Sequence, residues 1–183
     1  MLSWFKGAAL ARGTAREIYG AVVAQARQPA FYASHGVPDT PEGRFELVVL
    51  HLFLVLERLD REGEAGSRLG RVVIETFVVD MDDNMREMGV GDLAVPRRVK
   101  RAAAGLYERA LRYRQALAAT APAGALRALV GEIVVARPGA AAGGDMLADY
   151  VRQAAAALAA MPAREVMAGR IGFVPVGTAA GGQ

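Results

Sequence analysis

The sequence has no cysteine, a single tryptophan and two histidines among its 183 residues. Without cysteine the chain cannot form a disulfide, bind zinc through thiolates or use a cysteine nucleophile, and the absence is consistent with a reducing compartment. Aromatic residues make up 7% of the chain, whereas 53% of all residues are hydrophobic and alanine is abundant. This composition favours packed helices over strands. At this length we expect one domain with a single sizeable core.

The sequence also lacks an apolar run long enough to cross a membrane. Its longest run, residues 45–56, includes Glu46 and His51 and is shorter than the roughly 20 residues that a membrane-spanning helix needs. The start of the chain has no basic region ahead of an apolar stretch and no small-residue cleavage site, so neither an export signal nor a mitochondrial presequence is expected. We therefore expect a cytoplasmic protein. The cluster Trp4-Phe5-Lys6 could touch a membrane surface, but a frayed chain end is the favoured interpretation.

Turn residues and helical periodicity divide the chain into predicted helices. Thr14 and Thr40 are placed as N-caps, with Pro41 at the first position of the second helix. Gly89-Val90 is typical of the end of a helix. The predicted helices span residues 14–28, 41–62, 67–88, 96–119, 122–135, 146–158 and 164–168, and a flexible Ala/Gly linker is expected at 138–144.

This pattern predicts an all-α fold, a single compact domain of about six to seven helices. The helical domain is expected to cover residues 14–176. An N-terminal arm, residues 1–13, precedes it in this interpretation, and residues 177–183 are expected to be a disordered tail.

Three carboxylates, Asp80, Asp83 and Glu87, fall in one sector near the end of the predicted 67–88 helix, and we call them the acidic cluster. They repel one another and oppose the helix dipole, so a cation should face them. We predict a partly buried ion-pair network between the acidic cluster and a polar stripe on the 41–62 helix. The stripe consists of Arg44, His51 and Arg58, and the alternative partners are Arg97, Lys100 and Arg101.

Two other functions stay open from the charges alone. A magnesium-dependent helical enzyme could use the acidic cluster, although acids on one helix do not make a complete metal cage. A ribosome- or RNA-binding module could use Arg97, Arg101 and Arg112 on the outer face of the 96–119 helix, where Glu108 is spaced to pair with Arg112. No nucleophile–base pair or metal-ligand spacing is present, so we predict no catalytic residue, no metal site and no cofactor. Both histidines are expected to be hydrogen-bonded core residues.

Two segments, residues 31–45 and 80–93, are dense in turn formers, aromatic residues and charges. Together with shorter motifs in the same order, they make the chain resemble the ubiquinol–cytochrome c chaperone family over about residues 19–117. The motifs that carry the resemblance are Ala26-Arg-Gln-Pro-Ala-Phe-Tyr-Ala33, Gly36-Val-Pro-Asp-Thr40, Gly43-Arg-Phe45, Leu50-His-Leu-Phe-Leu54, Asp80-Met-Asp82, Arg86-Glu-Met-Gly-Val-Gly-Asp-Leu93 and Tyr107-Glu-Arg-Ala110.

The resemblance implies a non-enzymatic assembly factor for the respiratory bc1 complex. Such a protein holds newly made cytochrome b until haem and the other subunits are added. The implied partner is nascent or newly inserted cytochrome b, with no sequence-specific nucleic acid. Contact with the ribosome and the need for a small partner protein stay open.

A chaperone for a membrane subunit should display an apolar patch with charges at its edge. We predict this patch where the 31–44 connector meets the end of the 67–88 helix, because methionines there suit a surface that adapts to its client. The alternative is that the same side chains fill the core. The predicted patch is Phe31, Tyr32, Val37, Met81, Met85, Val90 and Leu93, rimmed by Asp39, Arg44, Asp82, Arg86 and Glu87. Asp82 and Arg86, four residues apart, are expected to pair on the outer face.

Overall fold

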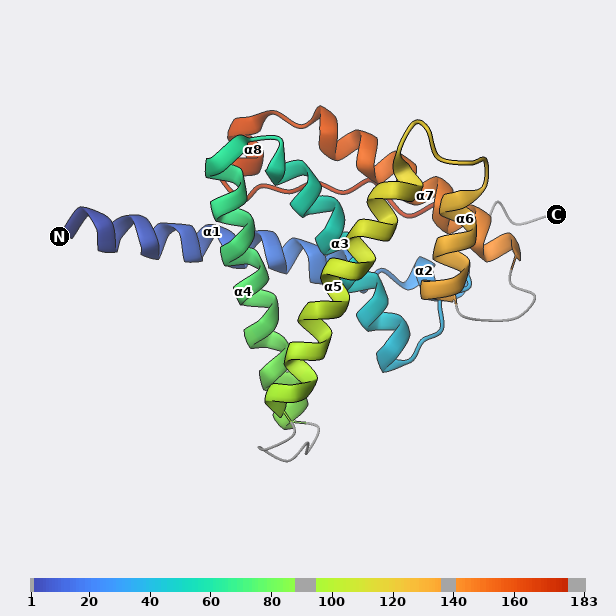
Figure 1. Cartoon of the computed structure of the whole chain (residues 1–183), viewed down its shortest axis with the longest axis horizontal. Coiled ribbons are helices and arrows are strands. Elements are labelled where there is room, and N and C mark those ends of the chain that lie inside the picture. Colours follow the sequence, from blue (N-terminus) through green and yellow to red (C-terminus); the bar gives the residue numbers. More distant parts are fainter. Residues whose placement is uncertain (1, 88–94, 136–140, 178–183) are drawn as a thin grey trace.

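A computed structural model describes the backbone of residues 2–87, 95–135 and 141–177, and the side chains of these residues apart from 2–6, 8, 95–99, 101–103, 141 and 142. Within these residues every regular element is a helix, so the all-α prediction is confirmed (Figure 1). The elements are α1 (Leu2–Ala26), α2 (Pro29–Ala33), α3 (Pro41–Asp60), α4 (Gly63–Glu87), α5 (Val95–Leu117), α6 (Ala125–Val130), the π-helical turn η1 (Gly131–Val135), α7 (Ala141–Ala160) and α8 (Ala163–Met167).

Helix α3 is the centre of the molecule, as its apolar sequence predicts. It contacts α1, α4, α5, α7 and η1, and most of its side chains are buried. A first apolar cluster lies on the side of α3 that faces α2, α6, η1 and α7. A second apolar cluster lies between α3, α1 and α4. A helix that is apolar on most sides is stable only where apolar side chains cover it from several directions, as these two clusters do.

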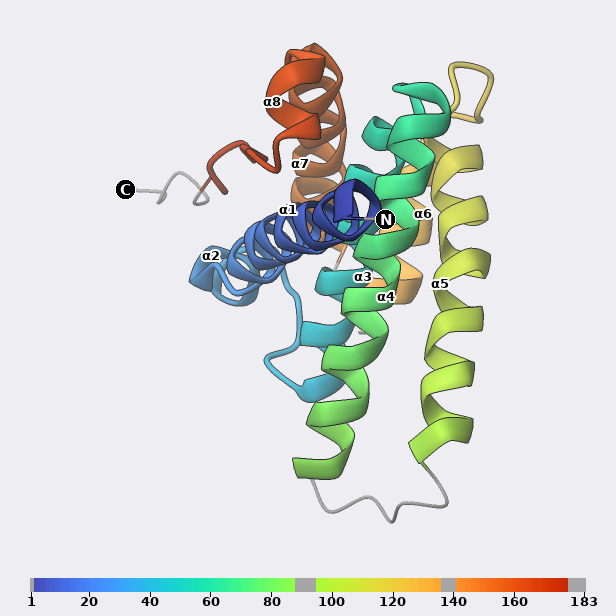
Figure 2. The same ribbon diagram turned by 90° about the vertical axis from the view of Figure 1, so that its left-hand side faces the viewer.

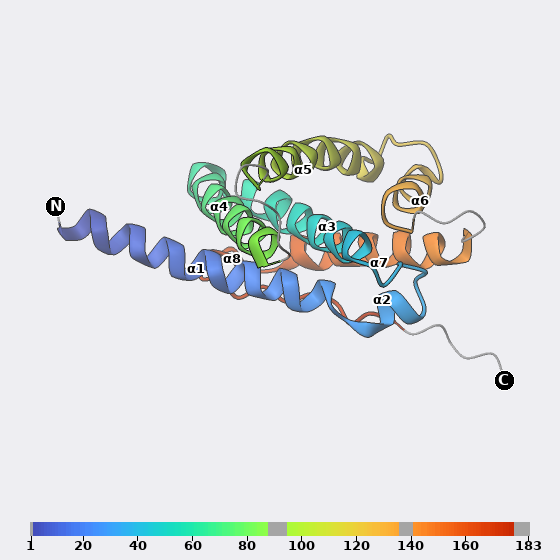
Figure 3. The ribbon, with the colours of Figure 1, turned by 90° about the horizontal axis from the view of Figure 1, so that it is seen from below.

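Several helices are longer than predicted. α1 begins at Leu2, so Thr14 lies inside the helix and is not its N-cap. Its N-terminal half extends past the rest of the molecule (Figures 1 and 3). α4 begins at Gly63 and α7 at Ala141, so part of the predicted linker is helical. Alanine-rich sequence has a high helix propensity, so a helix extends along it until a strong stop signal occurs. The Gly89-Val90 cap, residues 138–140 and residues 178–183 lie outside the described residues.

After α8 the chain runs without regular structure along α1 up to residue 177 (Figure 3). Ile171 and Phe173 of this segment pack against both apolar clusters. Gln25 of α1 donates a hydrogen bond from Nε2 to the carbonyl of Val174, at 3.1 Å. The C-terminal segment therefore closes the groove between the two halves of the core.

His51 is buried at the middle of α3, as predicted for a core histidine. Its Nδ1 lies 2.7 Å from the Leu47 carbonyl, which can only accept, so Nδ1 carries the proton. Its Nε2 then accepts from the Tyr150 hydroxyl, also at 2.7 Å. The rings of Phe31 and Phe173 meet the imidazole edge to face. Burial lowers the pKa of His51 to about 4, against the smaller opposing effect of the Leu47 hydrogen bond.

The buried imidazole predicts a pH-dependent stability. Because its pKa is lower in the folded chain than in the unfolded chain, the unfolded state binds the extra proton, and stability is lost as pH falls from about 6.5 towards 4. We expect His51 to lower the free energy of unfolding by about 2 kcal/mol between pH 7 and pH 5. Urea unfolding of the wild type and of His51→Phe over this range measures the difference in slope. Equal slopes for the two proteins would contradict the buried neutral imidazole.

The start of α3 confirms the predicted cap. Thr40 accepts a hydrogen bond from the backbone N–H of Gly43 at 3.1 Å, and Pro41 is at the first helical position. Gly43 is buried against the preceding connector, where an added Cβ would lie 2.1 Å from the Pro38 carbonyl oxygen. The connector is therefore fixed to the first turn of α3 by a contact that only glycine permits.

Gly43→Ala should accordingly destabilise the chain. We expect a loss of about 2 kcal/mol in the free energy of unfolding, because the Pro38 carbonyl belongs to the backbone and must move. Gly20→Ala is the matched control: Gly20 is exposed on α1 with nothing within 4 Å of its added Cβ. That substitution should stabilise the chain by up to about 1 kcal/mol. If chemical denaturation gave the same effect for both variants, the close contact at Gly43 would be refuted.

Candidate partner-binding surface

Residues 31–44, which run from α2 into the first turn of α3, do not expose all of the side chains predicted for the patch. Phe31 is 0% exposed and Val37 3% exposed, and both belong to the first apolar cluster. The short helix α2 turns the Phe31 ring onto Tyr150, with the ring centroids 4.9 Å apart. The patch prediction was wrong for these two residues, which lie in the core because burial among apolar side chains removes their surface from water.

The polar part of the connector does lie at the surface. Arg44 pairs with Asp39, with Nη2 and Oδ1 at 2.7 Å, and both side chains are more than half exposed. The half-buried Tyr32 donates from its hydroxyl to the Ala26 carbonyl at 2.8 Å. A groove of about 580 Å³ is lined by Arg27, Pro29, Tyr32, Ala33, Asp39 and Arg44. This part of the predicted surface is accessible.

The end of α4 provides the second part. Met81 and Met85 are half-buried, and Met81 packs on the second apolar cluster. Asp82 accepts from Arg86 at 2.7 Å, which confirms the predicted outward pair. Glu87 is exposed, whereas Val90 and Leu93 lie outside the described residues.

The first turn of α3 lies between these two parts (Figures 1 and 3). Its half-buried Phe45 approaches Phe77 of α4, with ring centroids 6.3 Å apart. The Arg109 guanidinium of α5 lies over the Phe45 ring at 6.0 Å. Sequence reasoning missed Phe45 as a site residue, although it stands in the Gly43-Arg-Phe45 motif. We call Tyr32, Phe45, Met81 and Met85, with the charges Asp39, Arg44, Asp82, Arg86 and Glu87, the α3-start surface.

The predicted pairing of the acidic cluster with Arg44, His51 and Arg58 was wrong, whereas the alternative partners Arg97 and Arg101 have side chains outside the described residues. The three residues of the stripe have other partners: Arg44 pairs with Asp39, His51 bonds Tyr150, and Arg58 bonds Glu62 and, at 2.8 Å, the Met161 carbonyl. In this stripe His51 and Arg58 face α7 and the residue that follows it. The acidic cluster belongs to α4, which packs on a different side of α3. Seven-residue spacing places residues on one face of a helix, but it does not say which neighbour that face meets.

Two members of the acidic cluster, Asp80 and Asp83, are instead directed towards α1. Asp80 accepts a hydrogen bond from the Tyr19 hydroxyl at 2.8 Å, and burial together with this bond raises the Tyr19 pKa. Asp80 and Asp83 line a groove of about 300 Å³ that also contains Arg12 and Arg16 of α1. Among the residues whose side chains are described, no three acidic or histidine side chains are grouped as a metal site.

Of the predicted basic face of α5, Arg112 is the residue whose side chain is described, and it is paired. Arg112 bonds Glu132 of η1 at 2.6 Å instead of the expected Glu108. Arg109 makes two hydrogen bonds to Glu46 of α3, at 2.5 and 2.7 Å, which raise the pKa of Arg109. The side chains of Arg97 and Arg101 lie outside the described residues. The Arg109–Glu46 and Arg112–Glu132 pairs connect α5 to α3 and η1.

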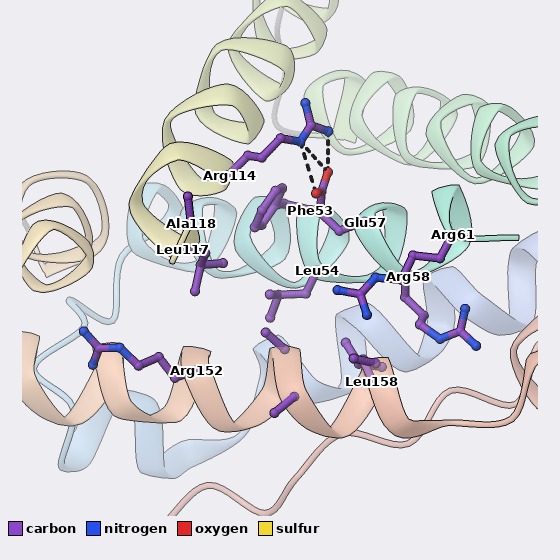
Figure 4. A pocket seen from close by; sticks show the side chains of 13 residues that line it. Phe53, Leu54, Glu57, Arg58, Arg61, Arg114, Leu117, Ala118, Arg152 and Leu158 are labelled. Carbon is purple, nitrogen blue, oxygen red and sulfur yellow. Dashed lines mark hydrogen bonds and ion pairs between the residues drawn. The ribbon is translucent and has the colours of Figure 1, made fainter. Parts of the chain in front are cut away.

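A cleft that sequence reasoning missed lies at the other end of α3, between α5 and α7 (Figure 4). Its volume is about 480 Å³. Four arginines line it, although they come from three helices and one inter-helix residue that are far apart in sequence. Its apolar lining includes Phe53, Leu54, Leu117 and Leu158, and its arginines are Arg58, Arg61, Arg114 and Arg152.

Within the described part of the chain no helix is both long enough and apolar enough to span a bilayer. Comparison with curated protein sequences found no match. A search of solved structures found the crystal structure of the Cbp3 homolog from Brucella abortus, with a TM-score of 0.83 and 35% sequence identity. The alignment covers 96% of this chain and 97% of that one. Residues 33–173 match the profile of the family described as Ubiquinol-cytochrome C chaperone. The resemblance read from the sequence is thus confirmed, and this chain belongs to the ubiquinol-cytochrome c chaperone family.

Proposed function

We propose that this protein is a non-enzymatic chaperone that binds newly made cytochrome b and supports its assembly into the bc1 complex. The observation that carries the proposal is the family match over residues 33–173, which includes the connector, α3 and α4. The similarity to the Cbp3 homolog extends over almost the whole chain and supports the same role.

The α3-start surface is the proposed binding site for cytochrome b. Its half-buried methionines, Met81 and Met85, can change rotamer to fit different apolar side chains of an unfinished membrane protein. The exposed Asp39–Arg44 and Asp82–Arg86 pairs stand at its edge, where charges favour specificity over affinity. Val90 and Leu93 remain part of the proposed site on sequence grounds.

The proposal includes a cytoplasmic location with peripheral contact at the inner membrane, where cytochrome b is inserted. The helical N-terminal half of α1, which projects from the body, carries Trp4 and Phe5 in its sequence. Aromatic residues next to a lysine favour the membrane–water interface.

Substitutions on the α3-start surface test the binding site. Met85→Asp places a charge in the apolar patch, and Arg44→Glu breaks the exposed pair with Asp39. Each should reduce the cytochrome b that co-purifies with the tagged full-length chain at least about fivefold, as expected when an interface residue is worth 1 kcal/mol or more. The measurement is an immunoblot of cytochrome b after mild-detergent solubilisation of cells that make the bc1 complex.

Arg71→Glu is the matched control, because Arg71 is exposed on α4 away from this surface. It should leave the co-purified amount unchanged. Thermal unfolding of all three variants shows whether they are folded. Equal capture by folded Met85→Asp, Arg44→Glu and wild type would remove this surface as the binding site, and absence of cytochrome b from the wild-type sample would refute the proposed function.

A further inference from the structure

The outer face of α5 exposes large apolar side chains. Tyr107 is 64% exposed and Leu111 52% exposed. The two lie one turn apart, and they are two of the four exposed large apolar residues among the described side chains. Both lie on the side of α5 that faces away from α3, since Leu106 and Tyr113 fill the opposite, buried side. Figure 2 shows α5 along one outer edge of the molecule.

This apolar face leads directly into the arginine cleft. Leu111 follows Tyr107 by four residues and Arg114 follows Leu111 by three, so the three lie along one side of α5. Ala118 comes directly after the end of this helix. Arg114 and Ala118 also line the cleft. The exposed stripe and the cleft therefore form one continuous surface, which begins with aromatic and aliphatic side chains and ends with guanidinium groups.

Four arginines line the cleft, and three of them have carboxylate partners, so Arg61 supplies its excess positive charge. Glu57 is the acidic residue in its lining, and it is bonded to Arg114, whose Nε lies 3.1 Å from both carboxylate oxygens. Arg152 pairs with the exposed Asp149 at 3.1 Å, and Arg61 has no partner among the described residues. In Figure 4 Arg114 comes from α5 and Arg152 from the facing helix α7, with the apolar side chains between them.

Arg58 is at the buried end of the same cleft. It is 5% exposed, and its two terminal nitrogens bond Glu62 and the Met161 carbonyl. Its Nε is buried without a hydrogen-bond partner. An unpaired buried donor is costly, and nearby negative charge would reduce that cost. The C-terminal ends of α3 and α7 lie here, and their carbonyl groups stabilise some of the guanidinium charge. They do not explain the exposed Arg61, which has no partner among the described residues.

We propose that the outer face of α5 and the arginine cleft together bind an acidic amphipathic segment of a second partner protein. Apolar side chains of that segment pack on Tyr107 and Leu111, and its carboxylates bind Arg61 and Arg152 in the cleft. Guanidinium groups hold carboxylates through paired hydrogen bonds, which fits a protein segment that combines acidic and apolar residues. This surface is separate from the α3-start surface, so the inference stands independently of the proposed function.

The probe is a fluorescent synthetic helix with leucines on one face and glutamates on the other, titrated with the full-length chain. Anisotropy should report saturable binding that weakens as salt rises from 50 to 300 mM, because the cleft contributes charge attraction. A peptide with lysines in place of the glutamates should bind at least about tenfold more weakly. Absence of binding, or equal binding of the lysine peptide, would overturn the proposal.

Substitutions locate the binding to this surface. Leu111→Ser and Arg61→Glu should each raise the Kd for the acidic peptide about tenfold, as expected for central interface residues. Leu10→Ser and Arg71→Glu remove an exposed leucine and an exposed arginine elsewhere, and should change the Kd less than about twofold. Equal effects of the two pairs would show non-specific binding and overturn the proposal.

Two further measurements separate other occupants. Sedimentation velocity tests for a second copy of this chain, and flotation with phosphatidylglycerol vesicles tests for an anionic membrane. The contrary outcome is that Leu111→Ser and Arg61→Glu abolish dimerisation or vesicle binding while the Kd for the acidic peptide stays unchanged. In that case the surface binds a second copy of the chain or a membrane, and the proposal is wrong. Cytochrome b co-purification with the same variants should be normal, which keeps this test distinct from that of the α3-start surface.

Discussion

The burial of α3 between two apolar clusters is the constraint on which the remaining structure depends. Because this helix is covered on most sides, its few polar residues need specific partners, and His51 finds them in the Leu47 carbonyl and the Tyr150 hydroxyl. That bond joins α3 to α7, while the C-terminal segment covers it through Phe173. The same central helix presents its first turn at one end of the molecule and borders the arginine cleft at the other.

Local signals in the sequence were sufficient for the cap of α3 and for the buried seam of α5. Thr40, Pro41 and the spacing of Leu106 and Tyr113 act within one helix, where the period of 3.6 residues decides which side is buried. The early start of α1 could not be predicted in the same way, because no apolar periodicity marks its projecting half. The helix propensity of alanine, where no apolar face packs on a neighbour, is only a weak signal for a helix.

The candidate site was harder to predict because it depends on how helices are rotated against one another. Phe31 and Tyr32 are adjacent in the sequence, yet the Phe31 ring enters the core and Tyr32 stays at the surface. The acidic cluster meets Tyr19 of α1, a contact between residues 61 positions apart. Arg58 and Arg152 reach one cleft from different helices, and no spacing along the chain indicates their proximity.

The most direct test of the account is to record where newly made cytochrome b contacts this protein in cells. A photo-crosslinking residue at position 85, in the α3-start surface, is compared with one at position 71 on the same helix during a short radioactive pulse. The account predicts a crosslink to pulse-labelled cytochrome b from position 85 that decays during the chase as the bc1 complex assembles, with little from position 71. Equal crosslinking from both positions, or a crosslink that forms only to fully assembled cytochrome b, would contradict it.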